Sequence, residues 1–132
     1  MNNLDAILEN FIALANSHGI RKEELMDGWT ADFDAAKWNL NYKRSLDANI
    51  KKYAQNLLSA VDLSRAAMAR EDKLTVTAAL IYAKIFSTQL ADAFSEVSAE
   101  FQRVLHEDSR FKWPIIPDDF KIPESYNYQG PL

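Results

Sequence analysis

The chain has 132 residues, of which 48% are hydrophobic, and its formal net charge is −4 at pH 7. This size suits one domain with one hydrophobic core, and the mixed, mildly acidic charge is neither that of a general nucleic-acid binder nor that of a disordered acidic tail. Cysteine is absent, which excludes disulfides, thiolate metal ligands and a cysteine nucleophile.

The N-terminal sequence begins Met-Asn-Asn-Leu-Asp. It lacks the basic start and the long apolar run of a signal peptide. No apolar run approaches the roughly 20 residues that span a bilayer. We therefore expect a cytoplasmic protein without a membrane partner.

The first predicted helix is capped by Asn2 or Asn3 and ends at Gly19, because glycine accepts the left-handed conformation that closes many helices. A short second helix is predicted to begin at Ile20 and to close at Gly28. The apolar residues of the first helix recur at helical spacing and share one face: Leu4, Ile7, Leu8, Phe11, Ile12 and Ala15.

This corner is similar to the opening of repressor-type helix-turn-helix domains. The resemblance covers about a dozen residues, in the order Leu14-Ala15, Gly19-Ile20 and Glu23-Glu24-Leu25, and it implies a DNA-binding corner. The following Trp29-Thr-Ala-Asp-Phe-Asp replaces the expected second glycine turn and polar recognition helix. Any corner of a helical bundle also consists of a helix, a glycine cap and a helix, and this is the preferred interpretation.

The segment from Thr30 to about Arg70 contains no glycine or proline, and its apolar spacing favours helix, with Phe33 to Leu40 in one phase. The phase slips at 41–45, where Ser45 is a good N-cap residue, so we expect a kink or break there. A short charged connection at 70–73 then predicts that helix 45–70 packs antiparallel to the next helix.

A long central helix is predicted over about 73–106. Its second half is amphipathic, with Asp92, Glu96, Glu100 and Glu107 on a wet face. The predicted fold is therefore all-α, an antiparallel bundle of three to four helices over residues 1–112. The apolar line of the long helix, spaced four and three, should face its partner helix: Val76, Leu80, Ala83, Ser87, Leu90, Phe94, Val97, Phe101 and Val104.

The first half of the long helix has a different distribution of apolar residues. The segment Ala78–Phe86 is apolar almost all the way round, with only Lys84 charged. Such a helix must be covered on more than one side. This surface exceeds what two shorter helices cover, so we expect a homodimer.

An extended C-terminal tail is predicted over residues 113–132. Prolines at 114, 117 and 123 forbid a helix, but the tail is too apolar to remain in water. We expect it to pack on its own bundle, on a second copy or on another protein. Its large apolar residues are Trp113, Ile115, Ile116, Phe120, Ile122, Tyr126 and Tyr128.

No residue pattern predicts a metal, a cofactor or an enzyme. The two histidines, His18 and His106, stand in neither an HExxH nor an ExxH arrangement. His18 is expected to interact with the carbonyls that end the first helix, and His106 to lie in the last turn of the long helix.

The main functional hypothesis is a non-enzymatic module that binds another protein. Small bacterial immunity proteins, antitoxins and phage-encoded inhibitors commonly have this size and character, which is an analogy of class and not a motif. The expected contacts are the acidic strip and the tail, namely Asp92, Glu96, Glu100, Trp113, Phe120, Tyr126 and Tyr128.

The alternative hypothesis is a regulator that binds nucleic acid through the Gly19 corner or the basic segment 37–52. Basic residues interleaved with aromatic ones can follow a phosphate backbone. On a net-acidic protein they would bind weakly and with strong salt dependence, and the same residues could instead meet the acidic strip of a second copy. The basic residues are Lys37, Lys43, Arg44, Lys51 and Lys52.

Overall fold

The computed structural model describes residues 3–26, 38 and 40–131. Within these residues there are helices and no strands, so the predicted all-α class is confirmed. The elements are α1 (Asp5–Ser17), α2 (Lys22–Met26), α3 (Leu46–Ala69), α4 (Lys73–Gln102), a π-helical turn (Arg103–Glu107) and a 3-10 turn (Glu124–Tyr126).

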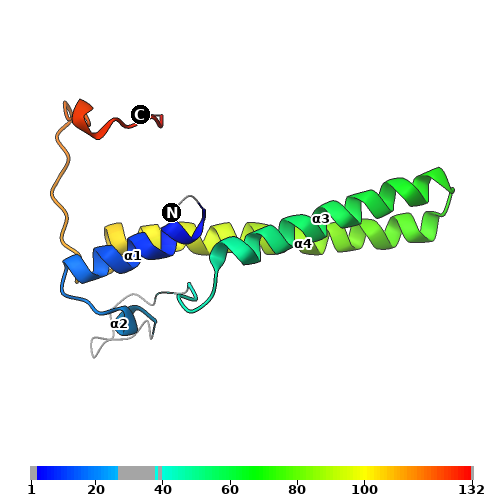
Figure 1. The fold of residues 1–132 in the computed structure, drawn as a ribbon, viewed down its shortest axis with the longest axis horizontal. Coiled ribbons are helices and arrows are strands. Elements are labelled where there is room, and N and C mark those ends of the chain that lie inside the picture. The colour runs from blue at the N-terminus through cyan, green and yellow to red at the C-terminus, as the bar shows by residue number, and fades with distance from the viewer. Residues whose placement is uncertain (1–2, 27–37, 39, 132) are drawn as a thin grey trace.

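The two longest helices, α3 and α4, form an antiparallel hairpin, as the short connection between them predicted (Figure 1). Helix α4 continues past the start of α3, and α1 lies beside this second part of it. Helices α1 and α3 therefore lie end to end beside α4. The C-terminal segment leaves the body at the α1 end, opposite the tip of the hairpin.

The N-termini of α1 and α3 meet head to head and cap each other. The Leu4 N–H donates to Asp47 Oδ1 at 3.0 Å, and the Asp47 N–H donates to Asp5 Oδ1 at 3.0 Å. The Ser45 hydroxyl donates to Asp5 Oδ2 at 2.7 Å. The backbone hydrogen bond from Asp47 lowers the pKa of Asp5, and the ion pair with Lys51 lowers the pKa of Asp47. Both carboxylates are placed where helix N-termini favour negative charge.

The predicted helix ends at Gly19 and Ser45 are confirmed. Gly19 has φ +75°, and the next N–H, of Ile20, donates to the Ala15 carbonyl at 2.8 Å, which closes α1 in a Schellman motif. The Ser45 hydroxyl caps α3 by accepting from the Ala48 N–H at 3.0 Å. The break before α3 therefore has the residue and the position that the sequence indicated.

The tip of the hairpin repeats this closing motif with a residue that is not glycine. Glu71 has φ +56°, and the Asp72 N–H donates to the Ala67 carbonyl at 2.9 Å. The Asp72 carboxylate then caps α4 by accepting from the Thr75 N–H at 3.0 Å. A left-handed conformation at Glu71 is strained, because its Cβ crowds the backbone.

The hydrophobic core lies at the α1 end of the molecule and not in the hairpin. Trp38, Leu40 and Tyr42 complete it from the segment before α3. The helix predicted across 33–40 lies mostly outside the described residues, and neither Trp38 nor Leu40 is helical. The buried members of the core are Leu8, Phe11, Ala15, Ile20, Leu25, Trp38, Leu40, Tyr42, Val97, Val104 and Phe111.

The predicted apolar line of α4 is only partly buried. Val97 and Val104 are in the core, as expected, but Leu80 is 57% and Phe94 49% exposed. The fully buried Ala79 shows that α3 packs on a neighbouring line of α4. Small buried residues of α3 face it and allow close approach of the two helices: Ala60, Ser64 and Ala67.

Candidate functional site

A buried carboxylate, Glu100, joins the segment before α3 to α4. Its Oε2 accepts a hydrogen bond from the Tyr42 hydroxyl at 2.9 Å and one from the Leu40 N–H at 3.4 Å. Its Oε1 accepts from Arg103 Nη1 at 2.8 Å. Burial and the charge of Glu100 raise the pKa of the Tyr42 hydroxyl. The prediction that Glu100 lies on a wet acidic strip and binds a partner there is wrong, because the side chain is fully buried and paired within the chain.

A second buried carboxylate, Asp108, follows the π-helical turn and joins it to Trp38, which precedes α3. It accepts from Trp38 Nε1 at 2.9 Å and from Arg110 Nη2 at 2.6 Å. Burial alone would raise the pKa of Asp108, but the hydrogen bonds from Arg110 and Trp38 hold it below its ordinary value. Sequence reasoning placed Glu100 on a solvated strip and did not single out Asp108, because their partners Tyr42 and Trp38 are far away in the chain and gave no local signal.

The remaining acidic residues of the predicted strip are accessible. Asp92 and Glu96 are exposed on α4, at the end nearer the core. Glu107 is exposed in the π-helical turn. The strip is therefore shorter than predicted and is interrupted where Glu100 turns inward.

The C-terminal segment is fixed to the body at one residue. Trp113 Nε1 donates to the Val104 carbonyl at 2.6 Å, and its ring lies 4.9 Å from that of His18 and stacks on Phe111 with a centroid distance of 6.2 Å. Trp113 is 40% exposed. In the described part of the tail, the contact with its own bundle is made by Trp113. Packing of the tail on a second copy or on another protein stays a prediction.

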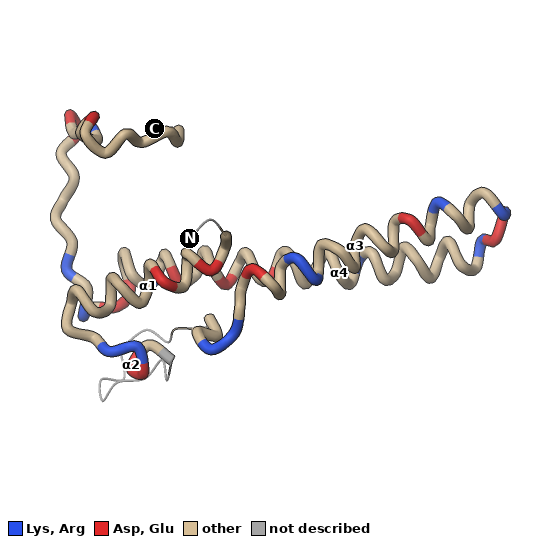
Figure 2. The backbone as a smooth tube through the Cα atoms, in the orientation of Figure 1, with Lys and Arg blue, Asp and Glu red and all other residues tan. Residues whose placement is uncertain are grey.

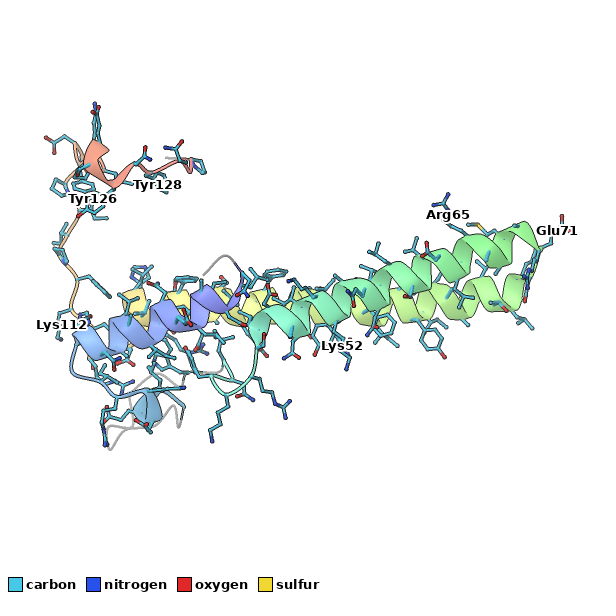
Figure 3. The ribbon with its side chains drawn as sticks, in the orientation of Figure 1. Lys52, Arg65, Glu71, Lys112, Tyr126 and Tyr128 are labelled. Atoms are coloured by element: carbon cyan, nitrogen blue, oxygen red, sulfur yellow. The ribbon has the colours of Figure 1, made fainter. Side chains whose placement is uncertain are left out.

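Beyond Trp113 the segment rises away from the helices and then turns, so that its C-terminal part lies apart from them (Figure 1, Figure 3). Its apolar side chains are accessible: Ile115 is 95%, Phe120 55% and Tyr126 74% exposed. Near the end, the Tyr128 hydroxyl donates to the Pro131 carbonyl at 2.7 Å, so this part is shaped by contacts within itself.

The basic residues of the alternative hypothesis lie around the start of α3 (Figure 2). Lys43, Arg44 and Lys52 are exposed. Lys51 is also exposed but forms an ion pair with Asp47 at 2.8 Å, which raises the pKa of the lysine. The fifth residue, Lys37, lies outside the described residues.

The histidines occupy the positions predicted for them. His18 Nδ1 lies 3.0 Å from the Leu14 carbonyl oxygen at the end of α1. His106 is exposed in the π-helical turn that ends the long helix. Within the described part of the chain, no group of three or more histidine, aspartate or glutamate side chains could hold a metal ion.

The hairpin exposes much of its apolar surface, which the nearly all-round apolar composition of α4 anticipated. Together α4 and the π-helical turn, Lys73–Glu107, are long and apolar enough to cross a membrane by length and composition, a test that core helices of soluble proteins also pass. Only 6% of the most apolar window is buried. The exposed large side chains of the hairpin are Leu58, Val61, Leu63, Met68, Leu74, Leu80, Ile81, Tyr82, Ile85 and Phe94.

No protein-family model and no curated protein matches the chain. The fold is similar to the crystal structure of a functionally unknown protein from Neisseria meningitidis MC58, with a TM-score of 0.73 and 17% sequence identity. The alignment covers 86% of this chain and 98% of that one. At this identity the likeness shows a shared fold and no function.

Proposed function

We propose that this chain is a non-enzymatic protein-interaction module that presents residues 113–131 as a binding arm. The observation that carries the proposal is the exposure of the arm's large apolar side chains, with Ile115 95%, Ile116 71% and Tyr126 74% exposed. Apolar and aromatic side chains of this kind form the energetic centres of protein interfaces.

The arm is built to lose little conformational freedom on binding. Trp113 holds its start against Val104, and prolines at 114, 117 and 123 restrict the backbone beyond it. A segment restricted before binding loses less entropy when it becomes ordered. Aromatic residues on such a segment can therefore contribute most of their burial energy to affinity.

The acidic residues near the base of the arm suggest the charge of the partner. Asp92 and Glu96 are exposed and precede Val104 by twelve and eight residues, which is roughly 18 and 12 Å along a helix. A partner that binds the arm and extends along α4 would meet these carboxylates. Basic residues at the rim of its binding surface would increase the association rate and specificity.

The two buried carboxylates support a structural and not a catalytic assignment. Glu100 and Asp108 each accept hydrogen bonds from an arginine and from an aromatic residue of the chain itself. By analogy of class, the proposed module is of the kind used by small bacterial immunity proteins, antitoxins or phage-encoded inhibitors.

The test is site-specific photo-crosslinking of the full chain in its source cell. A photoreactive phenylalanine at Tyr126 or Phe120 should crosslink one protein species, while the same group at Glu9, which is exposed on α1, should not. The purified partner should bind the full chain and lose at least about tenfold in affinity for a chain that ends at Trp113. Equal crosslinking from Glu9 and Tyr126, or equal affinity for the shortened chain, would refute the arm as the binding element.

A further inference from the structure

We propose that a second copy of this chain packs on one face of the α3–α4 hairpin, so that two hairpins form a four-helix bundle with its two-fold axis at Ser87. This surface is separate from the binding arm, so the inference goes beyond the proposed function. The surface, called here the Leu80 face, consists of Val61 and Met68 of α3 and Val76, Leu80, Ser87 and Phe94 of α4.

The described contacts and the helical period bring these residues to one side of the hairpin. Met68 and Val76 line the same hollow near the tip. Val61 lies seven residues before Met68, and Leu80 lies four after Val76, so each shares the side of its neighbour. A separate groove on the other side is lined by Leu63 and Tyr82 among others, from different lines of the two helices.

The Leu80 face is apolar and accessible. Met68 and Leu80 are each 57% exposed and Phe94 is 49% exposed. Between Lys73 and Asp92 the only charged residue of α4 is Lys84, and Figure 2 shows this stretch almost without charge. Lys84, three residues before Ser87, and Arg65, four after Val61, lie at the edges of the face. An apolar centre with few charges at its rim suits an apolar protein partner better than a nucleic acid.

The face continues an interface that already exists in the chain. Phe101 follows Phe94 by seven residues, and its ring packs on Phe11 of α1 with a centroid distance of 4.6 Å. Helix α1 therefore packs on this line of α4 at its C-terminal end, where Phe101 is 39% exposed. From Phe94 back to Leu80 the same line is exposed, because α3, which continues from α1 along α4, packs on the neighbouring line through Ala79. A helix of a second copy, lying beside α3, would cover it.

The spacing of the line makes it complementary to itself. Leu80 and Phe94 lie seven residues on either side of Ser87. When two such helices pack antiparallel about a two-fold axis at Ser87, Leu80 of each copy meets Phe94 of the other. The small Ser87 then lies where the helices come closest, at about 8 Å between their axes.

The open surface has the size of a dimer interface. From Val76 to Phe94 the face is about 27 Å long, and two helices side by side are about 20 Å wide. The footprint is therefore on the order of 500 Å² in projection, comparable with the roughly 800 Å² of accessible surface that each partner buries in a stable complex.

A lipid bilayer is the competing partner for an apolar hairpin, and the charges argue against it. Insertion of the hairpin would carry the charged tip, residues 70–73, through the membrane. It would also bury charge from α3, because Arg65 and Lys52 project from opposite edges of the hairpin (Figure 3). A second protein copy on the Leu80 face does not require the charged tip to cross an apolar layer.

The first experiment measures the mass of the full chain by sedimentation across a range of concentrations. The wild type should be a dimer, and Ser87→Arg, which places two cations at the axis, should raise the dimer dissociation constant about 100-fold or more. Gln89→Arg is the matched control, with the same charge change at an exposed position on the opposite flank of α4, and it should leave the constant unchanged. Helical circular dichroism of both variants confirms that they fold.

The second experiment uses the absence of cysteine. Because Ser87 faces its own copy at the axis, Ser87→Cys should form a covalent dimer on oxidation, and Gln89→Cys should not.

A wild type that is monomeric at every concentration, or a dimer equally sensitive to both arginine variants, would overturn the proposal. So would binding of the monomer to phosphatidylcholine and phosphatidylglycerol vesicles through this face. A dimer lost on removal of residues 114–132 but kept in Ser87→Arg would also overturn it, whereas failed crosslinking from the arm would bear only on the proposed function.

Discussion

The hydroxyl of Tyr42 provides a direct test of how the segment before α3 is held. Tyr42→Phe removes one hydrogen bond, of 2.9 Å, to the buried Glu100. A hydrogen bond to a charged group contributes about 1.5–3 kcal/mol. Glu100 keeps its bonds from Leu40 and Arg103, so the cost should be near the lower end, about 1.5–2 kcal/mol.

The measurement is urea unfolding followed by helical circular dichroism at one fixed protein concentration, because any self-association adds to apparent stability. The matched control is Tyr82→Phe, whose side chain is 52% exposed on α4, and its free energy of unfolding should change by less than about 0.5 kcal/mol. Glu100→Ala should cost more, about 3–5 kcal/mol, since it leaves Arg103 without its charge partner. Equal stability of the two phenylalanine variants would refute the reasoning, because the Tyr42 hydroxyl would then contribute nothing.

Three further predictions concern the tip, the helix junction and the arm. Glu71→Gly should raise the free energy of unfolding by about 1 kcal/mol, because it relieves a positive φ; a destabilised variant in urea titrations would contradict that geometry. The pKa of Asp5 is lower in the folded chain than in the unfolded chain, so its contribution is complete above the unfolded value and is lost as pH falls through the folded one; thermal melts from pH 7 to 3 should show a smaller loss for Asp5→Asn than for wild type. Removal of residues 114–132 should leave the urea midpoint nearly unchanged, since the arm is exposed beyond its anchor, and a large loss of stability would show that the arm packs on the body.

The parts of the fold that depend on local chemistry were predictable from the sequence. Gly19 and Ser45 end and begin helices because a left-handed conformation and a side-chain acceptor are needed at those positions. The antiparallel hairpin followed from the short charged connection at 70–73. The π-helical turn at 103–107 and the left-handed Glu71 were not predicted, because neither has a residue that favours it.

The buried carboxylates could not be found in the same way. Glu100 follows Glu96 by four residues, and a row of acids at that spacing indicates a solvated helix face. What buries Glu100 is the Tyr42 hydroxyl and the Arg103 guanidinium. Burial of a carboxylate depends on such partners, and a partner 58 residues away is set by tertiary packing and not by local pattern.

The apolar line of α4 was recognised from the sequence, but only part of it is buried: Val97 and Val104 lie in the core, whereas Leu80 and Phe94 are exposed. Small residues on α3, such as Ala60 and Ala67, bring it against Ala79, and the line through Leu80 and Phe94 is left beside that contact. A regular seven-residue spacing of large apolar side chains indicates a helical partner. Within the chain α1 packs on this line at Phe101, and Val97 and Val104 join the core around it. The exposed part of the line, from Leu80 to Phe94, is where we propose that a second copy packs, because a hairpin related by a two-fold axis would bring a helix of the required length and spacing.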